Sequence, residues 1–166
     1  MANAIQEHVQ ELSDTEASGT MQLVSFLLEN ETFAVEITKV REIILICEIT
    51  AIPESPSYVK GVINLRSSVI PVIDLRGLLG LTETDLTTES RIIVVRVESR
   101  MIGVIVDGVD EVLRISKSEI APPPPTIVGL GQDYLTGLIR LEERLLILLD
   151  LDKVLDVETG IETGRS

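Results

Sequence analysis

The chain has 166 residues, of which 45% are hydrophobic, so it is long enough to bury a core. Its formal net charge is −13 at pH 7 and its basic residues are scattered, so it lacks the dense positive surface that nucleic acids require. With two Phe, two Tyr and no Trp, it also has little material for stacking bases or sugars. Proteins are therefore the favoured class of ligand.

The two ends of the chain, residues 1–19 and 158–166, are rich in Glu, Thr, Ser and Gly and are expected to fray. The start lacks the basic and apolar regions of a secretory signal, and no apolar run is long enough to span a bilayer. The single cysteine, Cys47, cannot form an internal disulfide and is expected to be a buried or half-buried filler. A cytoplasmic protein without membrane insertion is expected.

The first half of the chain predicts two β-hairpins. Residues 22–28 and 33–37 are rich in Val, Ile and Phe and are joined by a polar turn. Residues 37–44 have apolar side chains at helical spacing, which indicates a short helix or an irregular strand. A second hairpin is predicted near residues 61–73. Within it, Pro71 cannot donate a ladder hydrogen bond, which predicts a sheet edge or a bulge.

The second half repeats the first. Residues 58–75 align without a gap with residues 134–151, which lie 76 positions later. In this alignment Gly61 matches Gly137, and Asp74 matches Asp150, so the two aspartates are expected to share a structural role such as capping the next element of the chain. Residues 33–43 align with residues 102–112 at a separation of 69, so the second copy is longer between its two blocks.

The extra residues of the second copy fall where Pro122, Pro123, Pro124 and Pro125 interrupt the chain. Four consecutive prolines fix φ and supply no N–H donors, which predicts an extended spacer in a loop. A ligand for a proline-reading domain is the alternative.

Four to five short strands in each copy predict a mostly β protein with two small closed barrels, because closure removes exposed edges. An open sandwich is the alternative. The expected organisation is a flexible lead over residues 1–19, a first barrel over 20–85, a second over 86–157 and a flexible tail over 158–166. Exchange of strands between the two barrels is possible.

Catalytic apparatus is not evident in the sequence. The only histidine, His8, lies in the N-terminal lead, so Ser-His and Cys-His pairs and zinc sites lack ligands. The pairs Asp107/Asp110 and Asp150/Asp152 could bind Mg²⁺ or act as acid and base, but solvated faces and element ends are the commoner explanation. We therefore expect no enzyme activity, no cofactor and no metal.

An unusual charge lies in the turn at residues 64–68, where Arg66 is presented on an otherwise apolar hairpin. Its planar fork of donors suits a carboxylate or carbonyl groups of a partner. An internal salt bridge to Glu42 or Asp74 is the alternative, and the sequence leaves both open.

Residues 59–75, together with 33–43, 102–112 and 145–151, resemble the CheW family of chemotaxis coupling proteins. The resemblance covers residues 22–155. It implies two intimately packed five-stranded SH3-like β-barrels with short helices, and a non-catalytic adaptor that links methyl-accepting transmembrane chemoreceptors to the histidine kinase CheA. The same module in twitching motility or another chemosensory pathway is the alternative, and a small carboxylate-metal binding protein is a more distant one.

The resemblance also implies particular residues. Receptor contact is expected at Val40, Glu42, Asn64 and Arg66, and kinase contact is expected barrel against barrel, with the CheA regulatory domain. The remaining motif positions with structural roles are Gly61, Pro71, Asp74, Gly137 and Asp150. One departure stands out, because Ser67 replaces the glycine that usually follows the motif arginine, and serine is strained if the turn needs a positive φ.

Overall fold

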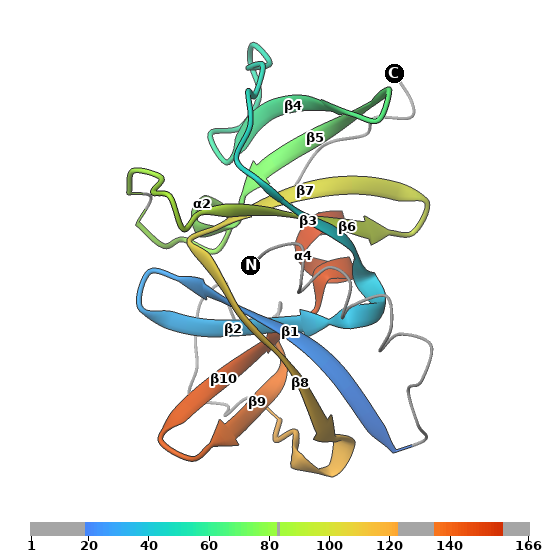
Figure 1. Cartoon of the computed structure of the whole chain (residues 1–166), viewed down its shortest axis with the longest axis vertical. Helices are drawn as coiled ribbons and strands as arrows, with labels where there is room; N and C mark the ends of the chain where they lie inside the picture. The colour runs from blue at the N-terminus through green and yellow to red at the C-terminus, as the bar shows by residue number, and fades with distance from the viewer. Residues whose placement is uncertain (1–18, 83, 123–134, 158–166) are drawn as a thin grey trace.

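The structure is a computed structural model that describes residues 19–82, 84–122 and 135–157 (Figure 1). The expectations for the chain ends, for His8 and for most of the proline segment lie outside these residues. The described part is mostly β, as predicted, and contains two five-stranded sheets with a few short helices.

Sheet 1 has the strand order β8-β1-β2-β10-β9. Its strands are β8 (Gly108–Ser116), β1 (Thr20–Leu28), β2 (Glu31–Glu36), β10 (Arg144–Leu149) and β9 (Leu135–Leu141).

Sheet 2 has the strand order β3-β6-β7-β5-β4. Its strands are β3 (Val40–Leu45), β6 (Arg91–Val97), β7 (Arg100–Val106), β5 (Ser68–Asp74) and β4 (Val59–Leu65). The four hairpins expected from the sequence are therefore present.

Each sheet contains strands from both repeats. Strands β1 and β2 of the first repeat lie in sheet 1 with β8, β9 and β10 of the second, and β6 and β7 of the second lie in sheet 2 with β3, β4 and β5. The repeats meet through two parallel pairs, β2 with β10 and β5 with β7, and through two antiparallel pairs, β1 with β8 and β3 with β6. Closure of each sheet into a barrel and the division of the chain near residue 86 stay predictions.

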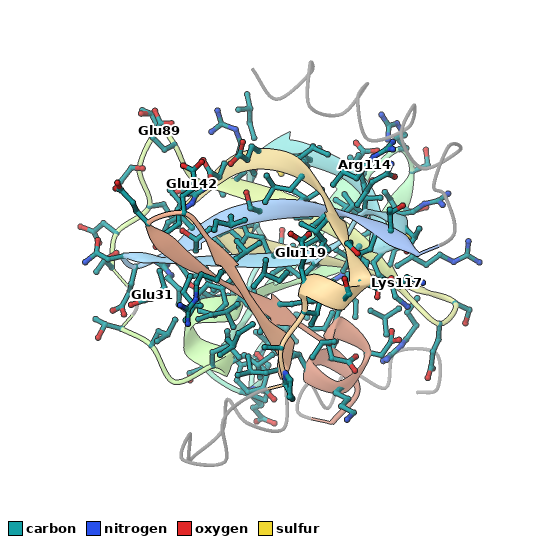
Figure 2. All side chains as sticks on the ribbon, turned by 90° about the horizontal axis from the view of Figure 1, so that it is seen from below. Glu31, Glu89, Arg114, Lys117, Glu119 and Glu142 are labelled. Atoms are coloured by element: carbon teal, nitrogen blue, oxygen red, sulfur yellow. The ribbon has the colours of Figure 1, made fainter. Side chains whose placement is uncertain are left out.

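Within the described residues, three apolar clusters hold the sheets together. One is inside sheet 1 and includes Leu23 and Leu146, and one is inside sheet 2 and includes Ile63 and Ile92. The third and largest, the shared core, draws on both sheets and on short helices, and Phe26 is among its members. Strand β6 alternates between the interior of sheet 2 and the shared core, so it is buried on both faces. Charged side chains such as those of Glu31, Glu89 and Lys117 lie on the outside (Figure 2).

The helical spacing of the apolar side chains in residues 37–44 does not reflect an α-helix. A 3₁₀ turn, η1, covers only Ile37–Lys39, and β3 begins at the next residue. The pairing of β3 with β6 shifts register between Val40 and Glu42, so an extra residue interrupts the alternation. Val40 and Ile43 both reach the shared core for this reason, although they are three positions apart. The irregular strand is therefore the correct alternative.

The two aspartates that end the second hairpins cap short helices, as predicted. Asp74 accepts a hydrogen bond from the backbone N–H of Arg76 at 3.0 Å and precedes α2 (Leu75–Leu78). Asp150 accepts one from the backbone N–H of Lys153 at 3.2 Å and precedes α4 (Leu151–Val157). Both helices pack in the shared core through residues such as Leu75 and Leu151.

Pro71 lies in β5, which is an interior strand between β7 and β4 and not a sheet edge. Its pairing with β7 begins only at Val72, one residue further on. Strand β4, opposite, carries a register shift between Val59 and Gly61. Pro71 is therefore tolerated where β5 is laddered on one side only, next to an irregular stretch of its partner.

Candidate protein-binding site

The β4–β5 hairpin is closed by a two-residue turn, Arg66-Ser67, between the paired residues Leu65 and Ser68. Both turn residues have positive φ, 51° at Arg66 and 70° at Ser67. Such turns match the twist of a hairpin and usually carry Asn or Gly. The turn thus needs the left-handed conformation that serine adopts only at a cost.

We expect Ser67→Gly to raise the free energy of unfolding by about 0.5–1 kcal/mol, because relief of the left-handed strain outweighs the added freedom of the unfolded chain. Ser68→Gly is the matched control, since Ser68 begins β5, and it should lower the same quantity by about 0.5–1 kcal/mol. Urea unfolding followed by circular dichroism measures both. A loss of stability in the Ser67 variant would contradict this assignment of the strain.

Arg66 forms an ion pair with Glu42 of β3 through its Nη1 atom. Of the two internal partners left open by the sequence, Glu42 is therefore correct, because Asp74 pairs with Arg76. The Glu42 side chain is only 11% exposed, whereas that of Arg66 is 69% exposed. Since one terminal nitrogen faces Glu42, the remaining guanidinium donors can serve a partner.

A face with apolar and polar side chains adjoins Arg66 on the outside of the hairpin. Asn64 pairs with Val69 and Val62 pairs with Pro71, so these four side chains share one face. Asn64 is exposed, and Val69 is 70% exposed although it is apolar. We call Arg66, Asn64 and Val69 the hairpin face.

Val40 is 6% exposed and lies in the shared core, on the same strand as Glu42. Its side chain therefore offers little surface of its own. A role of Val40 in receptor contact stays a prediction, and it would act through the placement of β3.

The second repeat carries a related arrangement at the β9–β10 turn. Arg144 pairs with Asp110 at 2.9 Å and with Glu111 at 2.7 Å, and Glu111 is the equivalent of Glu42. The equivalent of Arg66 is Glu142, however, so the exposed charge at the turn is reversed. In both sheets an arginine near the hairpin turn therefore forms an ion pair with the third strand of its repeat, which is β3 for Arg66 and β8 for Arg144.

The structure also contains a buried charge network that the sequence did not reveal. The Arg76 side chain is 2% exposed and contacts Asp74 at 2.8 Å, Asp107 at 3.0 Å and the Thr84 hydroxyl at 3.1 Å. Asp107 in turn accepts a hydrogen bond from the backbone N–H of Glu29 at 2.6 Å. The network therefore connects both repeats.

A signal for this network exists in the repeat alignment. Arg76 aligns with Asp152, and Asp152 pairs with Lys39 at 3.0 Å. The second residue of each short helix thus forms an ion pair with a residue of the other repeat. It is the cation in α2 (Arg76) and the anion in α4 (Asp152). A charge reversal inside an otherwise apolar repeat would have pointed to these positions.

The carboxylates considered for metal or acid-base chemistry hold specific structural contacts. Asp107 faces Arg76, Asp110 faces Arg144, Asp150 caps α4 and Asp152 faces Lys39. Among residues 19–82, 84–122 and 135–157, no group of three or more metal-ligating side chains occurs.

Cys47, expected to be buried or half-buried, is exposed. Its neighbours Ile46 and Ile49 pack against the interior of sheet 2 instead, so the segment turns Cys47 outward. In the described part of the chain, no helix has the length and apolar character needed to cross a membrane.

Comparison with known proteins gives one consistent result. The model of the CheW-like domain family matches residues 22–159. The chain is 39% identical to the chemotaxis protein CheW of Klebsiella aerogenes over 137 residues, which cover 82% of each chain. It is 36% identical to the CheW of Rhizobium meliloti over 141 residues, which cover 85% of this chain and 91% of that one.

A solved structure agrees with these sequence matches. The crystal structure of the scaffolding protein TtCheW from Thermoanaerobacter tengcongensis superposes with a TM-score of 0.77 at 34% identity. The match covers 84% of this chain and 94% of that chain.

Proposed function

This chain belongs to the CheW-like domain family, and from that premise we propose that it is a non-catalytic adaptor that couples transmembrane chemoreceptors to the histidine kinase CheA in chemotaxis. The likeness to chemotaxis CheW proteins over most of its length carries this function. The protein contributes binding energy and geometry, and the kinase contributes the chemistry.

We further propose that the hairpin face contacts the cytoplasmic tip of a methyl-accepting receptor. Arg66 and Asn64 would bind directly, because both are exposed. Glu42 would hold the Arg66 guanidinium in place through their ion pair. This ion pair restricts the Arg66 side chain before binding, so less conformational freedom is lost when a partner binds.

The kinase contact proposed for this chain lies away from the hairpin face, at exposed apolar strand ends of either sheet, against which a β-barrel of the CheA regulatory domain would pack. Candidates are Leu45 at 62% exposure and Leu145 at 46% exposure. A receptor on one surface and the kinase on another allow the receptor state to bias kinase activity, which is a coupling between two sites. In the cell, the protein would be cytoplasmic and recruited to the inner face of the membrane by receptors.

The proposed receptor site predicts a selective loss of affinity. Arg66→Ala should weaken binding of a receptor cytoplasmic fragment by about tenfold, which corresponds to about 1.4 kcal/mol, because it removes the exposed donors of the hairpin face. Affinity for the kinase regulatory domain should stay within about twofold. Isothermal titration calorimetry with each partner measures both affinities.

The matched control is Arg96→Ala, which removes an exposed arginine from β6 of the same sheet. It should leave both affinities unchanged. Equal loss in the Arg66 and Arg96 variants, or no loss in either, would count against the hairpin face as the receptor site.

A further inference from the structure

Strands β3 and β8 carry a bulge at equivalent positions. The register of β3 against β6 shifts at Arg41, and the register of β8 against β1 shifts at Asp110 and Glu111. The repeat alignment matches Arg41 with Asp110 and Glu42 with Glu111. A bulge changes the direction in which the side chains of a strand point, so the two equivalent pairs of charged side chains can be compared directly.

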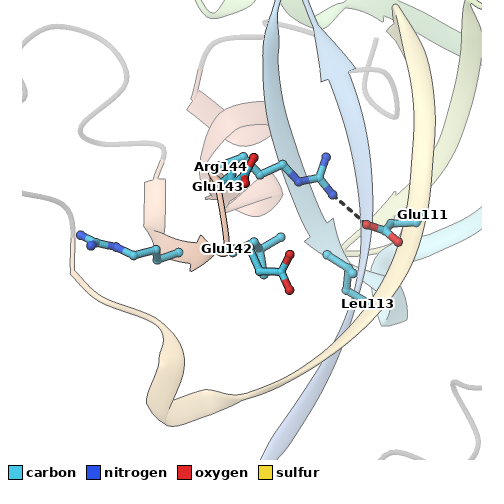
Figure 3. Close-up of a pocket in the computed structure, with 7 residues that line it drawn as sticks. Glu111, Leu113, Glu142, Glu143 and Arg144 are labelled. Atoms are coloured by element: carbon cyan, nitrogen blue, oxygen red, sulfur yellow. Dashed lines mark hydrogen bonds and ion pairs between the residues drawn. The ribbon is translucent and has the colours of Figure 1, made fainter.

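In the second repeat, the bulge belongs to a closed ion cluster. Arg144 pairs with Asp110 at 2.9 Å and with Glu111 at 2.7 Å, and the pair with Glu111 is drawn in Figure 3. Because one guanidinium reaches both carboxylates, the two bulge side chains point toward the same side of β8. Two carboxylates therefore share one arginine here.

In the first repeat, the same positions carry the opposite ratio of charges. Val40 and Ile43 both face the shared core, so Arg41 and Glu42 between them point away from it, because neighbouring side chains of a strand alternate. Glu42 pairs with Arg66. Arg41 is exposed, and within residues 19–82, 84–122 and 135–157 its side chain has no ion pair or hydrogen bond. Two arginines therefore adjoin one carboxylate.

The neighbouring turn does not supply a compensating excess of carboxylates. The β6–β7 turn lies at the same end of sheet 2 as the β4–β5 turn, because β5 and β7 are parallel. It carries Glu98, but Arg96 and Arg100 flank it. This end of sheet 2 is therefore positive, although the chain as a whole has a net charge of −13. A local positive charge of this kind attracts an acidic group of a partner.

We propose that Arg41 and Arg66 together bind one acidic side chain of the partner, which completes a cluster of two arginines and two carboxylates with Glu42. This inference rests on the proposed receptor site, since Arg66 belongs to the hairpin face, and it names the chemistry of the contact as an Asp or Glu of the receptor tip. The planar guanidinium forks of two arginines suit a carboxylate. Arg41 is thus a specificity-determining residue of that site.

The test measures the affinity of a receptor cytoplasmic fragment for variants of the full chain by isothermal titration calorimetry. Arg41→Gln should weaken binding about fivefold, because it removes the unpaired cation. Arg41→Asp should weaken it about thirtyfold or more, because the new carboxylate would pair with Arg66 as Asp110 pairs with Arg144. The matched control is Arg140→Gln, at an exposed arginine of β9 in sheet 1, which should leave the affinity unchanged.

The salt dependence of the affinity separates a direct charge contact from a structural role of Arg41. The difference between the parent chain and Arg41→Gln should shrink at about 0.5 M sodium chloride, because salt screens exposed charges. A difference that is the same at low and high salt would overturn the charge contact. Circular dichroism melts establish that each variant folds.

The failure of this inference differs from the failure of the proposed function. If Arg41→Gln binds the receptor fragment as tightly as the parent chain while Arg66→Ala binds it more weakly, the role of Arg41 is wrong and the receptor site stands. Absence of binding by the parent chain itself would overturn both.

Discussion

Gly61→Ala is expected to lower the free energy of unfolding by about 4 kcal/mol or more, and to leave little folded protein at 37 °C. Gly61 has a φ of 144°, which side chains rarely adopt, and a Cβ at this position would overlap the carbonyl oxygen of Thr50. Thr50 and Val62 form the bridge that links the segment after β3 to β4, with hydrogen bonds of 2.9 Å. The neighbouring backbone therefore cannot move away without breaking that bridge. Guanidinium chloride unfolding measures the loss.

Gly19→Ala is the control that isolates the backbone angle. Gly19 has a φ of 85°, but nothing lies within 4 Å of the position that a Cβ would take there, so only the left-handed strain of about 1–2 kcal/mol should be seen. Gly137→Ala should behave like Gly61→Ala, because its Cβ would lie 2.5 Å from the Ile120 side chain and 2.7 Å from the Ala121 carbonyl oxygen. Similar small losses in all three variants would refute the close approach as the cause.

Arg76→Met is expected to have a comparably large effect, a loss of about 3–5 kcal/mol in the free energy of unfolding. The change removes the cation that lies between Asp107 and Asp74, which is 1% exposed, and so deprives a buried carboxylate of its charged partner. Thermal and urea unfolding provide the measurement. An exposed arginine, replaced as Arg96→Met, should cost less than about 0.5 kcal/mol.

A second variant separates charge from packing at this network. In Arg76→Met/Asp74→Asn/Asp107→Asn, the buried charges are removed together, so a substantial part of the lost stability should return. If the triple variant is less stable than Arg76→Met, hydrogen bonding and not the unpaired charge dominates the network.

Local features of this fold could be predicted from the sequence. The duplication, the hairpins and the capping role of Asp74 and Asp150 follow from the repeat and from turn and cap preferences, and the structure confirms them. These features depend on contacts between residues close in sequence, for which spacing alone is informative.

The sequence left the long-range pairing open, because it allowed strands to be exchanged between the two barrels without deciding which strands pair. Hairpin β1–β2 lies in the sheet of the second repeat, and hairpin β6–β7 lies in the sheet of the first. The hydrophobic pattern within each strand would be the same in either sheet, so the periodicity of the sequence does not show which sheet a hairpin joins. The bulge in β3 mimicked helical spacing because it brought Val40 and Ile43 to the same core. The burial of Arg76 could not be predicted, because arginine is rarely buried unless it is paired. Its partner Asp107 lies in the other repeat, and the sequence does not show that the two residues are close.

For the candidate site, the sequence located the turn and its arginine but not the residues around them. It left Glu42 and Asp74 equally placed as partners of Arg66, and only the approach of β3 to the β4–β5 turn decides between them. The exposure of Val69, which is 70%, could not be predicted, because a valine in an apolar strand is expected to be buried. The equivalent residue in the second repeat, Leu145, is also exposed, so the two repeats share an exposed apolar position here.

The adaptor function is tested most directly by asking whether both partners bind at once. Sedimentation velocity of the purified chain with a CheA regulatory domain and a receptor cytoplasmic fragment would resolve a complex that contains all three proteins from the two binary complexes. We predict the ternary complex, because the proposed receptor and kinase surfaces are separate. Mutual exclusion of the two partners, or binding of neither, would contradict an adaptor that couples receptors to the kinase.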